Sequence, residues 1–129
     1  MTPEERQLLL KDLCARLPYK PKIQWDCADY NLLALENCEP ILARIMDDRP
    51  YACAISKPLE EMKPYLRPMS SMTEEELMQY KCMNDALDEN YEVHIDKAFS
   101  AFDWLNEHHF DYRGLIEKGL AIEAPEGMY

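Results

Sequence analysis

With 129 residues, the chain has room for one domain but not for two of ordinary size. Hydrophobic residues make up 47% of it and aromatic residues 10%, which is enough to fill a core and excludes a wholly disordered chain. The formal net charge of −11 disfavours direct binding to nucleic-acid phosphates or to an anionic membrane. No apolar stretch approaches the ~20 residues that span a bilayer.

The acidic excess lies almost entirely in the second half of the chain. Residues 1–70 hold ten Lys and Arg against eleven Asp and Glu, whereas residues 71–129 hold four against fourteen. We therefore expect a single α+β domain over residues 1–129 that contains an acidic helical region over residues 73–119.

The cysteines give no sign of disulfides or zinc. Their number is odd and their spacing irregular, whereas disulfide frameworks and zinc modules typically show even counts or short Cys-x-x-Cys pairs. The apolar run Leu8–Leu10 is too short for a signal peptide. We expect a cytoplasmic protein with reduced, mostly buried cysteines. The five are Cys14, Cys27, Cys38, Cys53 and Cys82.

The first predicted element is an N-terminal helix. Thr2 and Glu5 are spaced as a capping box, and Pro3 suits the first helical position. Pro18 is expected to end the helix. Four leucines then fall on one helical face: Leu9, Leu10, Leu13 and Leu17.

Residues 19–57 are predicted to form a small antiparallel β-meander of three to four strands. The segment 21–27 alternates in polarity, placing Ile23 and Trp25 on one face. Ala28 and Asp29 are expected to form a tight turn. Further strands are supplied by residues 30–36, 41–46 and 51–55.

A helix over residues 31–46 is the alternative to these strands, because Leu32, Leu35 and Leu42 share a helical face. Pro40 would fall inside that helix, where it removes a hydrogen bond and clashes with the preceding turn. The proline therefore favours strands.

Residues 57–72 form a proline-rich segment, in which each X-Pro step favours an extended preceding residue. Its apolar side chains indicate a strap that packs across the core, with Leu66 buried and Arg67 partly exposed. The alternative is a protein-interaction site formed by Tyr65, Leu66 and Arg67, held ready between two prolines.

A helix is predicted to follow this segment. Thr73 and Glu76 form a second capping box, and acidic residues in the first turn suit the helix dipole. The helix is expected to run to about Asp88, with Leu77 and Tyr80 facing inward.

One or two more helices complete the prediction. Asp96 is expected to cap a helix that ends near His108, and Asp111 to cap a short helix over residues 112–118 with Gly119 as its C-cap. The apolar stripe of the longer helix is expected to comprise Phe99, Phe102 and either Leu105 or Trp104.

His108, His109 and Asp111 are the only cluster that suggests a metal site. Adjacent histidines on a helix point about 100° apart, and the order differs from the His-Glu-x-x-His spacing that places two ligands on one face. The helix dipole alone also favours histidine at a C-terminus. We therefore predict no metal, no cofactor and no catalytic residues.

Several stretches carry a family resemblance. They read LLKDLCARLPY (9–19), KPYLRPMSSMT (63–73), DWLN (103–106), HHFDYRGLI (108–116) and EAPEGMY (123–129). They resemble a group of small uncharacterised proteins encoded by phages, prophages and mobile elements of gut bacteria. The resemblance covers about half the chain and implies a phage-related accessory protein in a bacterial cytoplasm; it assigns no functional residue.

Three functions follow as hypotheses. The leading one is a non-enzymatic accessory factor that binds a host or phage protein. The second is an acidic DNA mimic that inhibits a host nucleic-acid-binding protein, because the acidic excess of residues 71–129 resembles the charge of a phosphate backbone. The third and least favoured is a metal-dependent hydrolase that uses His108, His109 and Asp111.

Overall fold

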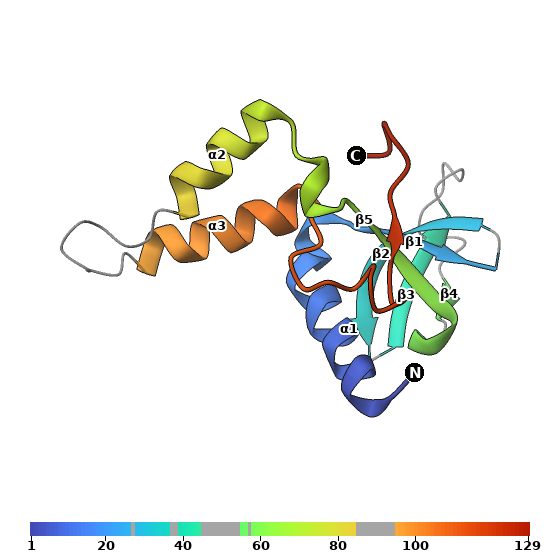
Figure 1. Cartoon of the computed structure of the whole chain (residues 1–129). Coiled ribbons are helices and arrows are strands. Elements are labelled where there is room, and N and C mark those ends of the chain that lie inside the picture. The colour runs from blue at the N-terminus through green and yellow to red at the C-terminus, as the bar shows by residue number, and fades with distance from the viewer. Residues whose placement is uncertain (27, 37–38, 45–54, 57, 85–94) are drawn as a thin grey trace.

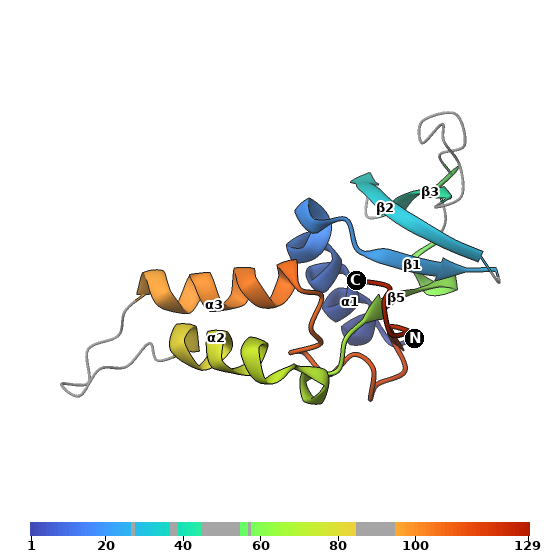
Figure 2. The ribbon, with the colours of Figure 1, turned by 90° about the horizontal axis from the view of Figure 1, so that it is seen from above.

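The computed structural model describes the whole chain except residues 27, 37–38, 45–54, 57 and 85–94. Helix α1 packs against a β-sheet, and helices α2 and α3 lie side by side and project away from it (Figures 1 and 2). We call α1 with the sheet the body, and α2 with α3 the arm. The predicted α+β class is confirmed.

Helix α1 (Pro3–Arg16) forms as its sequence predicts. The hydroxyl of Thr2 accepts a hydrogen bond from the backbone N–H of Glu5 at 3.1 Å, and the Glu5 carboxylate accepts one from the N–H of Thr2 at 3.4 Å. Leu9 and Leu13 are completely buried against the sheet. A single 3₁₀ turn, Leu17–Tyr19, ends the helix at the predicted proline.

Among the described residues the sheet has six strands in the order β4-β3-β2-β1-β5-β6. The strands are β1 (Lys22–Trp25), β2 (Ala28–Glu36), β3 (Glu39–Arg44), β4 (Ile55–Ser56), β5 (Met62–Leu66) and β6 (Ile122–Glu123). Strands β1 to β4 form the predicted antiparallel meander, so the alternative helix over residues 31–46 is excluded. Of the predicted strand 51–55, only Ile55 lies within the described residues.

The predicted turn at Ala28 and Asp29 is wrong. Both residues belong to β2, where they pair with Trp25 and Gln24 of β1. The chain reverses just before them, at Asp26, whose φ of 46° lies in the left-handed region that aspartate tolerates better than most residues.

The proline-rich segment lies within the sheet rather than across it. Its centre is β5, which pairs antiparallel with β1 and parallel with β6 and so makes the sheet mixed. The extended geometry that prolines favour is also the geometry of a strand, and Pro64 precedes the stretch that pairs with β6. The predicted burial of Leu66 is confirmed, since its exposed fraction is 0%.

The arm consists of α2 (Glu74–Asn84) and α3 (Ile95–Glu107). Its first helix has the predicted capping box, with the Glu76 carboxylate accepting from the N–H of Thr73 at 3.0 Å and the Thr73 hydroxyl accepting from the N–H of Glu76 at 3.2 Å. The predicted end at Asp88 falls outside the described residues. Asp96, the predicted cap, falls inside α3, which begins one residue earlier.

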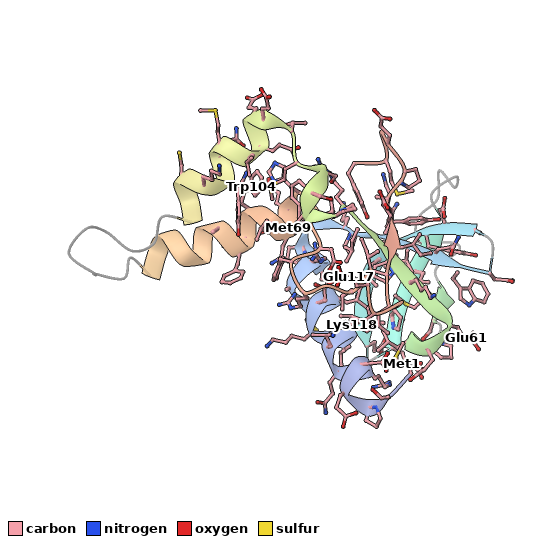
Figure 3. The ribbon with its side chains drawn as sticks, viewed as in Figure 1. Met1, Glu61, Met69, Trp104, Glu117 and Lys118 are labelled. Carbon is pink, nitrogen blue, oxygen red and sulfur yellow. The ribbon has the colours of Figure 1, made fainter. Side chains whose placement is uncertain are left out.

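The predicted inward faces of the arm are partly wrong. Leu77 is 40% exposed and Phe102 is 52% exposed, whereas Trp104 and Leu105 are buried. Phe102 and Trp104 lie about 200° apart around the helix, so only one of them can face the partner helix. Figure 3 shows Trp104 on the side of α3 that faces α2, where its ring stacks on Tyr80 at 6.2 Å between centroids.

Residues 112–118 form bends and turns instead of the predicted helix. Asp111 still caps backbone groups, since its two carboxylate oxygens accept from the N–H groups of Leu115 at 2.8 Å and Ile116 at 3.0 Å. Gly119 has the expected positive φ, 75°.

Two cysteines depart from the expected burial. Cys14 and Cys82 are exposed free thiols, whereas Cys27, Cys38 and Cys53 lie outside the described residues. No helix in the described part of the chain is long and apolar enough to cross a membrane.

Candidate functional site

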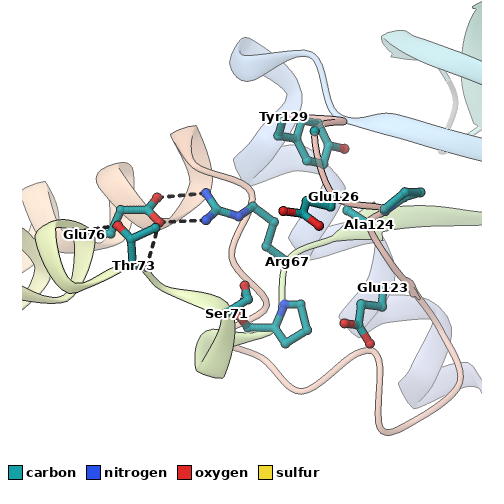
Figure 4. Close-up of a pocket in the computed structure, with 11 residues that line it drawn as sticks. Arg67, Ser71, Thr73, Glu76, Glu123, Ala124, Glu126 and Tyr129 are labelled. Carbon is teal, nitrogen blue, oxygen red and sulfur yellow. Dashed lines mark hydrogen bonds and ion pairs between the residues drawn. The ribbon is translucent and has the colours of Figure 1, made fainter.

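A cleft of about 530 Å³ lies where the arm begins. One wall comes from residues 67–76, which lead from the end of β5 into the first turn of α2. The other comes from residues 123–129, which run from β6 to the end of the chain (Figure 4). The cleft thus joins two segments that are far apart in sequence.

An ion pair between Arg67 and Glu76 spans the arm side of the cleft. The two guanidinium nitrogens of Arg67 donate to the two carboxylate oxygens of Glu76 at 2.9 and 2.8 Å. These hydrogen bonds are the largest cause of the low pKa of Glu76, about 2, and its hydrogen bonds to Thr73 add to it. The guanidinium also lies 4.2 Å from the ring centroid of Phe110. The charge of Arg67 is therefore already neutralised.

Tyr129 forms the opposite end of the cleft, and its position is fixed by three neighbours. Its ring stacks on His109 with centroids 3.6 Å apart. Its hydroxyl accepts from the backbone N–H of Lys22 at 2.8 Å and donates to the carbonyl of Tyr65 at 2.8 Å. Burial raises the pKa of Tyr129 to about 12, so the phenol stays neutral.

Two more carboxylates line the cleft, those of Glu123 and Glu126. Both side chains are exposed, and neither forms a hydrogen bond or ion pair with another described residue. Figure 4 draws both without a dashed contact. With Arg67 paired to Glu76, these two groups give the cleft a formal charge of −2.

Beneath this region lies a buried ion cluster formed by Asp12, Arg16 and Arg113. Asp12 accepts from Arg16 through one carboxylate oxygen and from Arg113 through the other, both at 2.8 Å. Arg16 also donates to the carbonyl of Phe110 at 2.6 Å, and its side chain and that of Asp12 are completely buried. The cluster therefore ties α1 to residues 110–113.

The sequence prediction missed this cluster, although a signal for it exists. Asp12 and Arg16 stand at helical spacing on the same face as Leu9 and Leu13, and all four are buried. A charged pair four residues apart on the apolar face of a helix indicates a buried ion pair.

The metal-ligand candidates each serve a different structural contact. The Nδ1 of His108 donates to the carbonyl of Trp104 at 2.9 Å, the ring of His109 stacks on Tyr129, and Asp111 caps the following turn. Within the described ranges, no three His, Cys, Asp or Glu side chains are placed to hold a metal ion together. The structure therefore offers no support for a metal site at these residues.

His109 is buried and carries an unusual environment. Its Nδ1 and the Nη1 of Arg16 have no hydrogen-bond partner among the described residues. Burial, followed by the positive charges of Arg16 and Lys22, lowers the pKa of His109 to about 4. The imidazole is therefore neutral at physiological pH.

Of the predicted interaction residues, only Arg67 reaches the cleft. Leu66 lies in the core, and Tyr65 is buried with its hydroxyl donating to Asp29 at 2.7 Å. Arg67 is partly exposed, as predicted, with 22% of its side chain accessible. Glu76 reaches the cleft through its predicted capping box, whereas Glu123, Glu126 and Tyr129 carry no local sequence signal and are placed there by the fold.

Comparison with known proteins adds no family to this description. No protein-family model matches the sequence, and neither a curated protein nor a solved structure shows significant similarity to it. The chemistry of the cleft is therefore argued from its own residues.

Proposed function

We propose that the protein is a non-enzymatic accessory factor that binds another protein, and that the cleft is part of its binding surface. The observation that carries this proposal is a cleft whose walls are held in place without a ligand. The Arg67–Glu76 pair holds one end, and the contacts of Tyr129 hold the other. A surface that is ordered before binding loses little conformational entropy when a partner docks.

The arm beside the cleft adds support. Met78 on α2 is 68% exposed and Leu77 is 40% exposed. Methionine is an adaptable side chain that is enriched in protein interfaces. The first turn of the same helix lines the cleft, so the arm and the cleft form adjoining surfaces.

The acid–base properties of the cleft favour binding over catalysis. A general acid or base works best with a pKa near the working pH. In the cleft, the pKa of Glu76 is about 2 and that of Tyr129 is about 12, so neither group exchanges protons readily near neutrality.

We place the protein in the bacterial cytoplasm, as a factor of a phage or mobile element, on the strength of the motif resemblance. Two stretches that carry the resemblance, residues 63–73 and 123–129, supply most of the two walls of the cleft. The resemblance and the candidate site therefore converge on the same part of the molecule.

The test is affinity capture from a lysate of a gut bacterium with two matched variants. Ser71 lines the cleft, whereas its exposed neighbour Ser70 does not. Ser71→Trp is expected to fill the cleft and abolish capture of the partner, and Ser70→Trp to retain it. Thermal unfolding establishes that both variants are folded. Equal capture by the two variants, or no specific partner for the wild type, contradicts the proposal.

The identity of a captured protein separates this proposal from DNA mimicry. A nucleic-acid-binding protein that duplex DNA displaces would support the acidic mimic, which the charge of residues 71–129 suggests. Glu76 contributes nothing to such a mimic because Arg67 neutralises it, while Glu74 and Glu75 are exposed.

A further inference from the structure

Building on the proposed function, we infer that the cleft receives a basic side chain, arginine or lysine, from the partner protein. The inference follows from the charges that remain after the internal pairing. Arg67 is held in two hydrogen bonds by Glu76, so the pair presents no net charge to an anionic ligand. Glu123 and Glu126 line the same cleft and have no cationic partner among the described residues.

The surroundings strengthen the attraction for a cation. Carboxylates in a hollow with low-dielectric walls act through a weaker solvent screen than carboxylates on a convex surface. The walls here include Pro68, Pro125 and the ring of Tyr129. The neutral phenol of Tyr129 adds no charge of its own to the field of the two carboxylates.

The size and chemistry of the cleft select a side chain over other cations and over anions. A volume of about 530 Å³ lies in the range of pockets that enclose small organic groups, which is more than a bare metal ion requires. A phosphate or an acidic peptide would meet an excess of two negative charges. A guanidinium can donate to two carboxylates through its planar fork, and a lysine ammonium can reach one of them on its flexible stem.

The geometry of the cleft is set before any ligand arrives. The backbone N–H of Ala124 donates to the carbonyl of Leu66 at 2.8 Å, and the Nζ of Lys22 donates to the carbonyl of Met128 at 2.7 Å. These contacts anchor both ends of the segment that carries Glu126. The carboxylates of this wall are therefore presented from a fixed backbone, which lowers the cost of ordering on binding.

Titration with a blocked tri-arginine peptide, N-acetylated and C-amidated, tests the inference by ¹⁵N NMR. The chain has three glycines, and only Gly127 lines the cleft, so its amide signal is the reporter and those of Gly114 and Gly119 are internal references. Tri-arginine is expected to shift the Gly127 signal in a saturable way. The uncharged analogue tri-citrulline, similar in shape, is expected to leave it unchanged.

Two double variants that remove the same net charge distinguish binding in the cleft from nonspecific attraction of the peptide to an acidic protein. Glu123→Gln/Glu126→Gln is expected to weaken tri-arginine binding about tenfold, because two exposed ion pairs are lost. Glu4→Gln/Glu36→Gln removes the same net charge from two exposed positions outside the cleft and is expected to weaken it less than twofold. Equal weakening by the two double variants, or a Gly127 shift produced equally by tri-citrulline, overturns the inference.

The two proposals fail separately. If Ser71→Trp abolishes partner capture while tri-arginine leaves Gly127 unmoved, the protein-binding function stands and the basic ligand is rejected. If tri-arginine binds as expected but no partner is captured, the cleft remains a site for a basic group and the accessory-factor proposal is lost.

Discussion

Different interactions stabilise the body and the arm. In the body, α1 packs completely buried leucines against the sheet and places the ion cluster of Asp12, Arg16 and Arg113 beneath the surface. In the arm, two helices meet through Trp104, whose ring stacks on Tyr80 and on Phe110, while Met78 and Phe102 remain largely exposed.

The difference indicates which part of the molecule can change without unfolding the rest. Buried leucines and buried charges are in contact with neighbours on every side, so truncating one of them lowers the free energy of unfolding of the whole domain. A helix pair with a narrow packed face opens at a lower free energy than a core. Exposed apolar side chains on that pair are therefore available to a partner at little cost to stability.

The largest expected effect comes from breaking the ion cluster. Asp12→Ala leaves the guanidinium of Arg16 buried without a counter-charge, and removing one partner of a buried pair costs about 3–5 kcal/mol. The free energy of unfolding from urea titration measures the loss. Arg6→Gln breaks an exposed pair with Glu60 and should change little. Comparable effects of the two substitutions would show that the cluster is not a central support of the body.

Truncating one side chain in each region tests the contrast directly. Leu66→Ala in β5 should lower the free energy of unfolding by about 2–5 kcal/mol, because it leaves a cavity in the core. Met78→Ala on α2 should stay within about 0.5 kcal/mol, since its side chain is mostly in water. A large loss for Met78→Ala in urea titration would mean that the arm is packed more extensively than its exposure indicates.

The body should also lose stability in mild acid through His109. Its pKa is about 4 in the folded protein against an ordinary 6.5, so the unfolded chain binds the proton first as the pH falls. The contribution is fully present above about pH 6.5 and is lost between pH 6.5 and 4, by about 3 kcal/mol. The groups that oppose protonation are Arg16, Lys22, His108 and Arg67.

The check is the slope of unfolding free energy against pH in this window. His109→Asn removes the titrating group, and asparagine tolerates the positive φ of 62° at this position. The variant should lack the part of the slope due to His109, whatever its absolute stability. An unchanged slope would assign the acid sensitivity to other groups.

The smallest expected effect concerns the ion pair that links the arm to the body. Arg67 depresses the pKa of Glu76 from 4.5 to about 2, so this contribution is present above about pH 4.5 and is lost as the pH falls toward 2. Because the pair is partly solvated, we expect a loss of about 1 kcal/mol. Thermal unfolding of Glu76→Gln across this range should lack that component, whereas Glu75→Gln, an exposed neighbour, should retain it. Identical profiles for the two variants would show that the pair adds nothing measurable.

The sequence by itself determined the elements whose signals are local. The capping boxes at Thr2 and Thr73 each need only residues three positions apart, and both form as predicted. Alternation in segment 21–27 and the position of Pro40 were sufficient to favour strands over a helix. The burial of Leu66 also followed from an apolar residue in an extended, proline-flanked segment.

The tertiary structure alone decided the features that join distant segments. The proline-rich segment became a strand of the sheet because β1 and β6, about 40 and 60 residues away, supplied its hydrogen-bonding partners. Arg113 reaches Asp12 across 101 residues, and Tyr129 reaches Tyr65 across 64. The exposure of Phe102 depended on which face of α3 met α2. Hydrogen bonds, ion pairs and burial depend on distance in space, which local sequence patterns do not encode, and such contacts bring the two walls of the cleft together.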